Sequence, residues 1–430
     1  MDINRKTAYF TLMDIEQKKQ YSNLALNHHI LCMKPTSQGF VRELVYGVLE
    51  NKYLIDYIIN QLIPKDVSKV KKQDLTILRM GIYQIAKMNS VPEYAAVNES
   101  VMLAKKFARG REKFVNGVLR SYISNRFSIN LPKREDDEIR YLSVKYSYEP
   151  WIVKLWLSEY DVEFVEKLLE EGNKTPGVTI RLNWLKGMKR DVIKGLEERG
   201  FEVEQGKLCS NALHVKGGDL LDTGMYKMGV FSIQDEASQL VVNMLEPNDT
   251  DVVMDVCAAP GGKTLAIAEA MNNKGTVIAR DIYKRKVEII NKEAKRLGLT
   301  NVQTGTWDAA KLDSSMVEQA DKVLVDAPCS GLGVIRRKPE IKYKKLTEEL
   351  RLLPVKQLSI LKTAAKYVKP GGILMYSTCT INSYENQKVV ADFLRNNSRF
   401  DLIESRQLLP HVDGADGFYI CKMIKKDSII

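Results

Sequence analysis

The feature that most constrains the fold is a repeated alternation of short apolar runs and amphipathic segments from residue 250 onward. Near-continuous apolar runs of this length are typical of parallel strands, because helices cover both faces of such a sheet. We predict strands at Asp251–Val256, Thr276–Ala279, Val302–Thr306, Lys322–Val325 and Ile373–Tyr376, and helices at 264–272, 284–297, 355–368 and 384–396. The alternation predicts a doubly wound α/β domain, and ligands bind such sheets at the carboxyl ends of the strands.

The first 127 residues predict a different architecture, an all-α bundle. Apolar side chains recur at helical spacing from Arg42 to Tyr53 and again from Leu75 onward. Pro35, Pro64 and Pro92 separate such runs, and short connections between amphipathic helices favour a compact bundle.

The stretch between these two regions predicts a linker and a small α+β module. Residues 130–137 are polar and contain a proline, as linkers do. The predicted elements after it are a helical segment at Trp151–Leu169, a strand at Val178–Asn183, a helix at Asp191–Arg199 and a short strand at Phe201–Glu204. We therefore expect three domains, at 1–127, 128–235 and 236–430.

Basic residues are concentrated at the start of the chain. Residues 1–127 hold 20 Lys and Arg against 11 Asp and Glu, which accounts for most of the formal net charge of +11. Such an excess favours a polyanionic partner, most simply nucleic acid, although a lysine-rich solvated surface is an alternative explanation.

Hydropathy and cysteine usage indicate a soluble protein of a reducing compartment. No apolar run approaches the ~20 residues that span a bilayer, and the first residues lack the apolar core of a signal peptide, so we expect a cytoplasmic location. The six cysteines form no C-x-x-C pair, and with only four histidines we expect no metal site. The cysteines are Cys32, Cys209, Cys257, Cys329, Cys379 and Cys421.

The turn after the first strand of the α/β domain is rich in glycine. It reads D-V-C-A-A-P-G-G-K-T over residues 255–264. The end of this stretch matches a phosphate-binding P-loop, but Cys257 stands where that motif needs its first glycine, and no G-x-G-x-x-G motif is present. A nucleoside cofactor without a phosphate chain, such as S-adenosylmethionine, fits better, and a purely structural turn is the alternative.

Acidic residues follow the next two strands. Asp281 lies 26 residues after Asp255, near the spacing at which a carboxylate binds ribose hydroxyls. Asp308 follows the third strand and could accept a hydrogen bond from an adenine amine. A single surface aspartate means little, but acids at three successive strand ends favour a nucleoside site.

Two cysteines follow neighbouring strands on the same edge of the sheet. Cys329 lies in D-A-P-C-S-G after the fourth strand, and Cys379 lies in S-T-C-T after the fifth. Carbon 5 of cytosine is too weak a nucleophile to attack a methylsulfonium, and addition of a thiolate to C6 activates it by splitting one hard step into two easier ones. Asp326 could stabilise the charge by bonding N3 and the exocyclic amine. The residues themselves do not decide which thiol attacks.

Together these three motifs resemble those of the RNA cytosine-5 methyltransferase family, the Nol1/Nop2/Sun group. The resemblance implies that Cys379 is the nucleophile and that Cys329 assists release of the product, although DNA cytosine methyltransferases use a Pro-Cys cysteine as nucleophile. It also implies a set of positions that bind S-adenosylmethionine. These are Cys257, Ala258, Ala259, Pro260, Gly261, Gly262, Lys263, Asp281, Asp308 and Asp326.

The resemblance extends over almost the whole chain. Residues 114–120 resemble part of a NusB-type RNA-binding domain, and residues 180–183 and 231–238 are similar to the module that precedes the catalytic domain in this family. A NusB-like domain joined to this catalytic domain is similar to family members that methylate bacterial 16S ribosomal RNA. The resemblance implies a Rossmann-like sheet of order 3-2-1-4-5-7-6, with Phe418–Met423 as its late antiparallel strand, and we expect a monomer.

Two groups of basic residues are candidates for binding the RNA backbone. Arg336, Arg337, Lys338 and Lys342 follow the Pro-Cys loop, and Arg109, Lys113 and Arg120 lie in the helical region. A solvated loop is the alternative for the first group.

Two other functions remain open from the sequence. One is methylation of a different RNA, such as transfer RNA. The other is an RNA-binding assembly factor whose catalytic site is inactive, although the presence of both cysteines argues against it.

Overall fold

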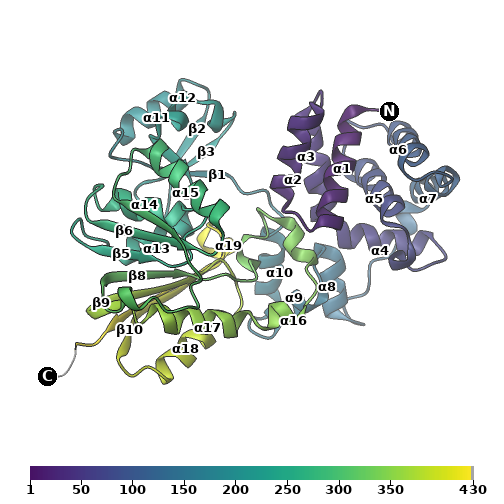
Figure 1. Ribbon diagram of the computed structural model, residues 1–430. Coiled ribbons are helices and arrows are strands. Elements are labelled where there is room, and N and C mark those ends of the chain that lie inside the picture. Colours follow the sequence, from purple (N-terminus) through teal and green to yellow (C-terminus); the bar gives the residue numbers. More distant parts are fainter. Residues whose placement is uncertain (428–430) are drawn as a thin grey trace. The chain divides into compact units, whose positions relative to one another are not determined.

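The computed structural model describes residues 1–427, which form two compact units (Figure 1). The first unit contains Met1–Lys174 and Ile335–Leu346, and the second contains Thr175–Val334 and the chain from Thr347 onward. No division falls at the expected boundaries 127 and 235. The helices between residues 128 and 174 belong to the helical unit, and the polar stretch 130–137 connects two helices inside it.

The first unit is all-helical, as its sequence predicts. Several of its helices begin at a side chain that caps free backbone N–H groups: Asp2 accepts hydrogen bonds from Asn4 N and Arg5 N, and Ser37 accepts one from Phe40 N. The helices are α1 Ile3–Lys18, α2 Ser22–Met33, α3 Gln38–Glu50, α4 Lys52–Leu62, α5 Lys72–Lys87, α6 Glu93–Phe107, α7 Glu112–Asn125, α8 Glu138–Tyr146, α9 Pro150–Leu157 and α10 Val162–Glu171.

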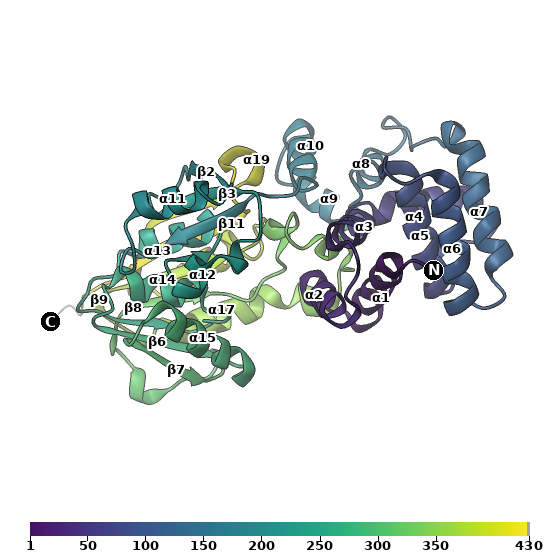
Figure 2. The ribbon, with the colours of Figure 1, turned by 90° about the horizontal axis from the view of Figure 1, so that it is seen from above.

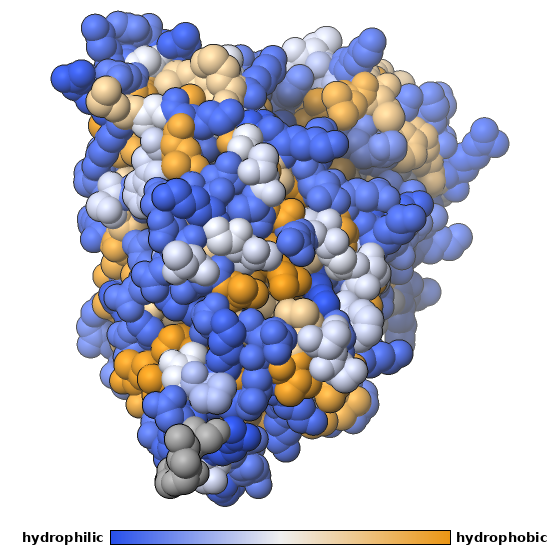
Figure 3. Space-filling model, turned by 60° about the vertical axis from the view of Figure 1, so that its left-hand side comes forward, coloured by the Kyte–Doolittle hydropathy of each residue, from blue (hydrophilic) through white to orange (hydrophobic). Residues whose placement is uncertain are grey.

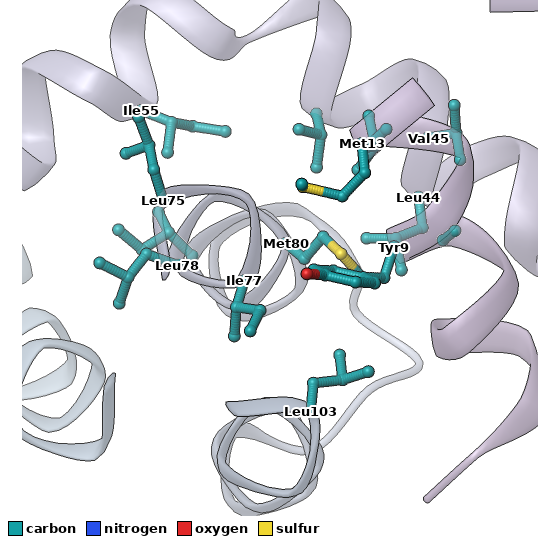
Figure 4. Close-up of a cluster of buried hydrophobic side chains, with 14 of the residues drawn as sticks. Tyr9, Met13, Leu44, Val45, Ile55, Leu75, Ile77, Leu78, Met80 and Leu103 are labelled. Carbon is teal, nitrogen blue, oxygen red and sulfur yellow. The ribbon is translucent and has the colours of Figure 1, made fainter. Parts of the chain in front are cut away.

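The core of the bundle is built around α5, which is buried along most of its length. Ile77, Leu78 and Met80 of this helix are fully buried, and Figure 4 shows side chains from neighbouring helices, including Tyr9 and Leu44, around them. Burial of such side chains is worth about 1.5–3 kcal/mol each, so packing rather than helix propensity stabilises the bundle.

A segment from the α/β part of the sequence completes the helical unit. Residues 335–346 include a short 3₁₀ helix, η6 Pro339–Tyr343. The Tyr343 hydroxyl accepts a hydrogen bond from Lys52 N at 3.1 Å, and Trp151 Nε1 donates to Lys344 O at 2.9 Å. The chain therefore leaves the unit that holds Cys329, contributes these residues to the helical unit, and returns.

The second unit begins with a small antiparallel sheet of order β2-β3-β1-β4. Its strands are β1 Val178–Leu182, β2 Glu202–Gln205, β3 Ala212–Lys216 and β4 Phe231–Ile233, and its helices are α11 Lys189–Glu197 and α12 Gly224–Met228. The predicted strands correspond to β1 and β2. The sequence did not indicate β3 or β4, because β4 has only three residues and β3 contains a histidine and a lysine.

The rest of this unit is a seven-stranded sheet of order β10-β11-β9-β8-β5-β6-β7. Renumbered from β5 as the first strand, this order is the expected 3-2-1-4-5-7-6, and β11 pairs antiparallel with both of its neighbours. The strands are β5 Val252–Asp255, β6 Thr276–Asp281, β7 Val302–Thr306, β8 Ala320–Asp326, β9 Val368–Thr378, β10 Phe400–Leu408 and β11 Phe418–Lys425.

Helices cover both faces of this sheet (Figures 1 and 2), which confirms the doubly wound prediction. Side chains alternate along each strand: Val253 packs in the core with α13–α15, and Met254 packs in the core with α17 and α18. The helices are α13 Glu236–Leu245, α14 Gly262–Ala270, α15 Lys284–Leu297, α16 Glu348–Arg351, α17 Leu353–Ala364, α18 Gln387–Arg395 and α19 Pro410–Asp413.

Two elements differ from their prediction for local reasons. The segment predicted as helical at Trp151–Leu169 divides into α9 and α10, because the Asp161 side chain accepts a hydrogen bond from Phe164 N and starts a new helix. The strand β10 was not predicted as an apolar run, since it lies at the edge of the sheet and most of its side chains are exposed.

On the face in Figure 3, hydrophilic residues predominate and apolar side chains form small separate patches. Within residues 1–427, no helix has the length and apolar character needed to cross a membrane.

Candidate active site

The turn between β5 and α14 forms one side of the site. Asp255 is buried at the end of β5, where it accepts a hydrogen bond from Thr264 Oγ1 at 2.7 Å. Gly261 has a φ of 106°, a backbone conformation that side-chain-bearing residues rarely adopt. The glycine and the internal Asp255–Thr264 bond together fix how the chain turns from strand into helix.

Burial raises the pKa of Asp255 from its ordinary value of 3.8 to about 7. The folded chain therefore binds this proton more tightly than the unfolded chain does, so the contribution of Asp255 to stability falls as the pH rises from about 4 to about 7. We expect Asp255→Asn to remove this pH dependence. The free energy of unfolding of the variant minus that of the wild-type protein should therefore be larger at about pH 8 than at about pH 5.

Denaturant unfolding of both proteins at the two pH values measures this difference. Asp313→Asn is the control: hydrogen bonds from Ser315 and Arg280 lower the pKa of Asp313 below its ordinary value of 3.8, so its contribution to stability changes only below about pH 4 and this variant should differ from wild type equally at both pH values. If the free energy of unfolding of Asp255→Asn differed from that of wild type by the same amount at both pH values, the raised pKa of Asp255 would be contradicted.

Acidic side chains follow the next two strands, as the sequence predicts. The Asp281 carboxylate accepts hydrogen bonds from Tyr283 N at 3.0 Å and from Ala259 N at 3.3 Å, so it joins the second strand end to the glycine-rich turn. Asp308 accepts one from Ala310 N at 3.1 Å. The side chain of Ile282, beside Asp281, is 51% exposed and could contact a flat base.

Lys263 pairs with an aspartate instead of facing open solvent. Its ammonium lies 2.8 Å from Asp326 Oδ2 and 4.7 Å from the centre of the Phe418 ring, and Ser377 Oγ donates to Asp326 Oδ1 at 2.8 Å. A P-loop lysine would instead reach toward phosphates. Asp326 is therefore held by a cation on one oxygen and a hydroxyl on the other, and Ser377 is a contact that the sequence did not indicate.

The two cysteines that follow β8 and β9 lie together. Cys329 Sγ is 3.2 Å from Cys379 Sγ. Backbone hydrogen bonds join the two loops: Ala327 N donates to Ser377 O at 2.9 Å, and Gly333 N donates to Cys379 O at 3.0 Å. The site therefore holds two thiols in contact beside a fixed carboxylate.

The environment of Cys329 keeps it protonated. The hydrogen bond with Cys379, burial and the negative charges of Glu385 and Asp326 raise the pKa of the Cys329 thiol. Burial beside Asp255 and other carboxylates also raises the pKa of Cys257, so this third thiol does not resemble an activated nucleophile.

The basic residues after the Pro-Cys loop are less accessible than expected. Lys342 is fully buried, donates to Glu50 O at 3.1 Å and to Asn173 Oδ1, and its burial lowers its pKa to about 7. The Arg336 side chain is 6% exposed and lies 3.7 Å from Glu171. The prediction that Lys342 contacts RNA is therefore wrong for this conformation, because its ammonium is satisfied inside the helical unit, and Arg336 is nearly as enclosed.

The second basic group borders a groove of about 760 Å³ between α6 and α7. Lys113 and Arg120 line it and are exposed, together with Tyr94, which is 78% exposed. Arg109 is exposed nearby in sequence but does not line the groove. The groove therefore has cationic and aromatic groups of the kind that bind single-stranded nucleic acid, and Glu93 and Glu112 also line it.

Three known families match separate parts of the chain. The RsmB/F family of 16S rRNA methyltransferases matches residues 242–424, and the NusB family matches residues 2–124. The ferredoxin-like domain of RsmF/B-like methyltransferases matches residues 148–219.

Individual proteins resemble the chain along its whole length. A probable ribosomal RNA small subunit methyltransferase B of Bacillus subtilis (strain 168) is 40% identical, over 98% of each chain. A second such protein, of Synechocystis sp., is 31% identical over 98% of this chain and 99% of its own. The crystal structure of PH0851 has a TM-score of 0.86 at 25% identity, over 99% of each chain. The chain therefore belongs to the ribosomal RNA small subunit methyltransferase B family, and its seven-stranded unit has the methyltransferase fold of that family.

Proposed function

We propose that this methyltransferase methylates C5 of a cytosine in 16S ribosomal RNA with S-adenosylmethionine, through a covalent bond between Cys379 and C6. The observation that carries the proposal is the pair of thiols 3.2 Å apart, beside an aspartate that Lys263 and Ser377 hold in place. Methylation of an oxygen or of a basic nitrogen requires no thiol, whereas methylation at C5 of a pyrimidine does.

The residues at the strand ends suit S-adenosylmethionine. Asp281 and Asp308 offer carboxylate oxygens to ribose and adenine, and the exposed Ile282 offers an apolar surface to the base. Lys263, the basic residue of the glycine-rich turn, is already paired with Asp326, which suits a cofactor without a phosphate chain. When bound, S-adenosylmethionine supplies an electrophilic methyl group.

The protein's own groups account for the remaining chemistry. The Cys379 thiolate attacks C6 and forms an S–C bond as the C5=C6 π bond opens and N3 takes up a proton from solvent, while Asp326 accepts hydrogen bonds from the N3–H so formed and from the exocyclic amine and stabilises the charge on the ring. After methylation at C5, the C5 proton passes to water, its electron pair restores the C5=C6 double bond, the S–C bond breaks to return Cys379 as a thiolate, and N3 gives its proton back to solvent. Cys329, in contact with Cys379, assists this release.

Incubation of the protein with 16S ribosomal RNA and methyl-labelled S-adenosylmethionine tests the proposal. The expected product is 5-methylcytosine at one position, found by nucleoside mass spectrometry and bisulfite mapping. Methylation of transfer RNA alone would identify another substrate, and cofactor and RNA binding without transfer would indicate an inactive assembly factor.

The α6–α7 groove is our candidate RNA surface in the helical unit. We expect the double charge reversal Lys113→Glu/Arg120→Glu to weaken binding of ribosomal RNA about tenfold at low salt. The slope of log affinity against log salt concentration should also become shallower, by the equivalent of roughly one to two phosphate contacts. Filter binding over a salt series measures both effects. Lys167→Glu, on the exposed side of α10, is the control, and equal weakening by the control would contradict the groove assignment. Arg109, Arg337 and Lys338 remain further candidates.

A further inference from the structure

Two adjacent buried polar residues lie behind the reactive loops. Glu385 is 1% exposed and Asn386 is fully buried, and both follow the Cys379 loop and precede α18. A buried carboxylate or amide is costly unless it is hydrogen-bonded, so their partners indicate what the fold uses them for.

Glu385 bonds the loop that carries Cys329. Its Oε2 accepts hydrogen bonds from Ser330 N at 2.8 Å and from Gln357 Nε2 at 3.0 Å. Gln357 Nε2 also donates to Pro328 O at 3.0 Å. Glu385 and Gln357 therefore hold the residue before Cys329 and the residue after it.

Asn386 bonds the loop that carries Cys379. Its Oδ1 accepts a hydrogen bond from Thr378 Oγ1 at 2.5 Å, and its Nδ2 donates to Thr380 O at 3.0 Å. These contacts also fix the residues directly before and after the cysteine. Asn386 is anchored in turn by Gln407 of β10, at 3.0 Å.

The two loops share one further contact. The hydroxyls of Ser330 and Thr380 are 2.7 Å apart. Because both loops are already tied to consecutive residues of one backbone, a small displacement of either would change the distance between the thiols.

We propose that Glu385 and Asn386 are positioning residues, one for each thiol: Glu385 holds Cys329 for release of the product, and Asn386 holds Cys379 for attack on C6. This assignment rests on the proposed function. The negative charge of Glu385 contributes to the raised pKa of the Cys329 thiol and so helps to keep that thiol protonated. Glu385 Oε1 also accepts a hydrogen bond from Asn382 Nδ2, three residues after Cys379, at 2.8 Å. The different effects expected of the two residues therefore rest on the bonds directly beside each cysteine: Glu385 bonds Ser330 N, whereas Asn386 bonds Thr378 and Thr380.

The test uses isosteric variants of the full-length protein. Glu385→Gln removes the charge that binds Ser330 N, and Asn386→Asp removes the donor to Thr380 O. We expect Glu385→Gln to slow release of the covalent protein–RNA adduct about tenfold, so that the adduct accumulates while its formation rate stays near that of wild type. We expect Asn386→Asp to slow adduct formation about tenfold without accumulation.

Glu236→Gln is the matched control for loss of a buried carboxylate. Glu236 is also 1% exposed and accepts hydrogen bonds from Leu208 N and Cys209 N, but it lies in a separate polar cluster with His214. This variant should lower the melting temperature without changing the ratio of adduct formation to release. The affinity for S-adenosylmethionine, measured by calorimetry, should be unchanged in Glu385→Gln and Asn386→Asp.

Cys329→Ala, assayed alongside, distinguishes failure of the positioning roles from failure of the proposed function. If it accumulates adduct but the Glu385 and Asn386 variants affect both steps equally, or behave like Glu236→Gln, the positioning roles are wrong and the proposed function stands. If Cys329→Ala forms no adduct and wild type makes no 5-methylcytosine, the proposed function fails and the positioning roles fail with it.

Discussion

Replacing Cys379 with alanine is expected to reduce methyl transfer by about 10⁴-fold or more, because the covalent route is lost with the nucleophile. Replacing Cys329 with alanine should instead leave attack on C6 intact and slow release, so that a covalent protein–RNA adduct accumulates. The two thiols are 3.2 Å apart, so both lie in the same site and opposite phenotypes would indicate different chemical roles.

The measurement is a denaturing gel of protein incubated with labelled RNA and cofactor, beside the rate of methyl transfer. Cys32→Ala is the control, since Cys32 is an exposed thiol of the helical unit and should behave as wild type. Adduct accumulation in Cys379→Ala would mean that the roles of the cysteines are reversed.

Replacing Arg181 with methionine is expected to lower the free energy of unfolding of the second unit by about 3–5 kcal/mol. The Arg181 side chain is 2% exposed and forms two parallel hydrogen bonds of 2.9 Å with Glu269 of α14. It also donates to Gly262 O at 3.0 Å, at the start of the same helix. The substitution leaves the Glu269 carboxylate buried without its partner, and it releases the turn that precedes α14.

Denaturant unfolding followed by near-UV circular dichroism tests this expectation. The double variant Arg181→Met/Glu269→Met should recover part of the loss, because no unpaired charge then remains buried. Arg190→Met, which breaks an exposed pair with Asp191, should change stability by less than about 1 kcal/mol. A loss of similar size in both single variants would contradict the role assigned to Arg181.

Affinity for S-adenosylmethionine should also fall in Arg181→Met, because Arg181 bonds the backbone of the cofactor turn. Calorimetric titration at a temperature where the variant is folded measures this effect. Unchanged affinity would limit Arg181 to a structural role in joining the small sheet to α14.

Local sequence information predicted most of the α/β domain. The strands β5, β6 and β8 and the later part of β9 contain short apolar runs, and the helix α15 has the predicted bounds 284–297 because its buried apolar side chains recur at helical spacing along one face. The sequence failed where burial is one-sided or the element is short. The edge strand β10 is mostly exposed, and β4 has three residues.

Parallel strands bring their carboxyl ends to one edge of a sheet whatever the details of packing, so the strand pattern was enough to predict which side chains share that edge. Asp281, Asp308, Asp326 and both cysteines could therefore be assigned to one site. Tertiary packing set what these groups and their neighbours contact. It paired Lys263 with Asp326 and placed Glu385 and Asn386 behind the two thiol loops. It also buried Lys342 inside the helical unit, 292 residues along the chain from its partner Glu50. Such contacts join segments far apart in sequence, so neither periodicity nor a motif can indicate them.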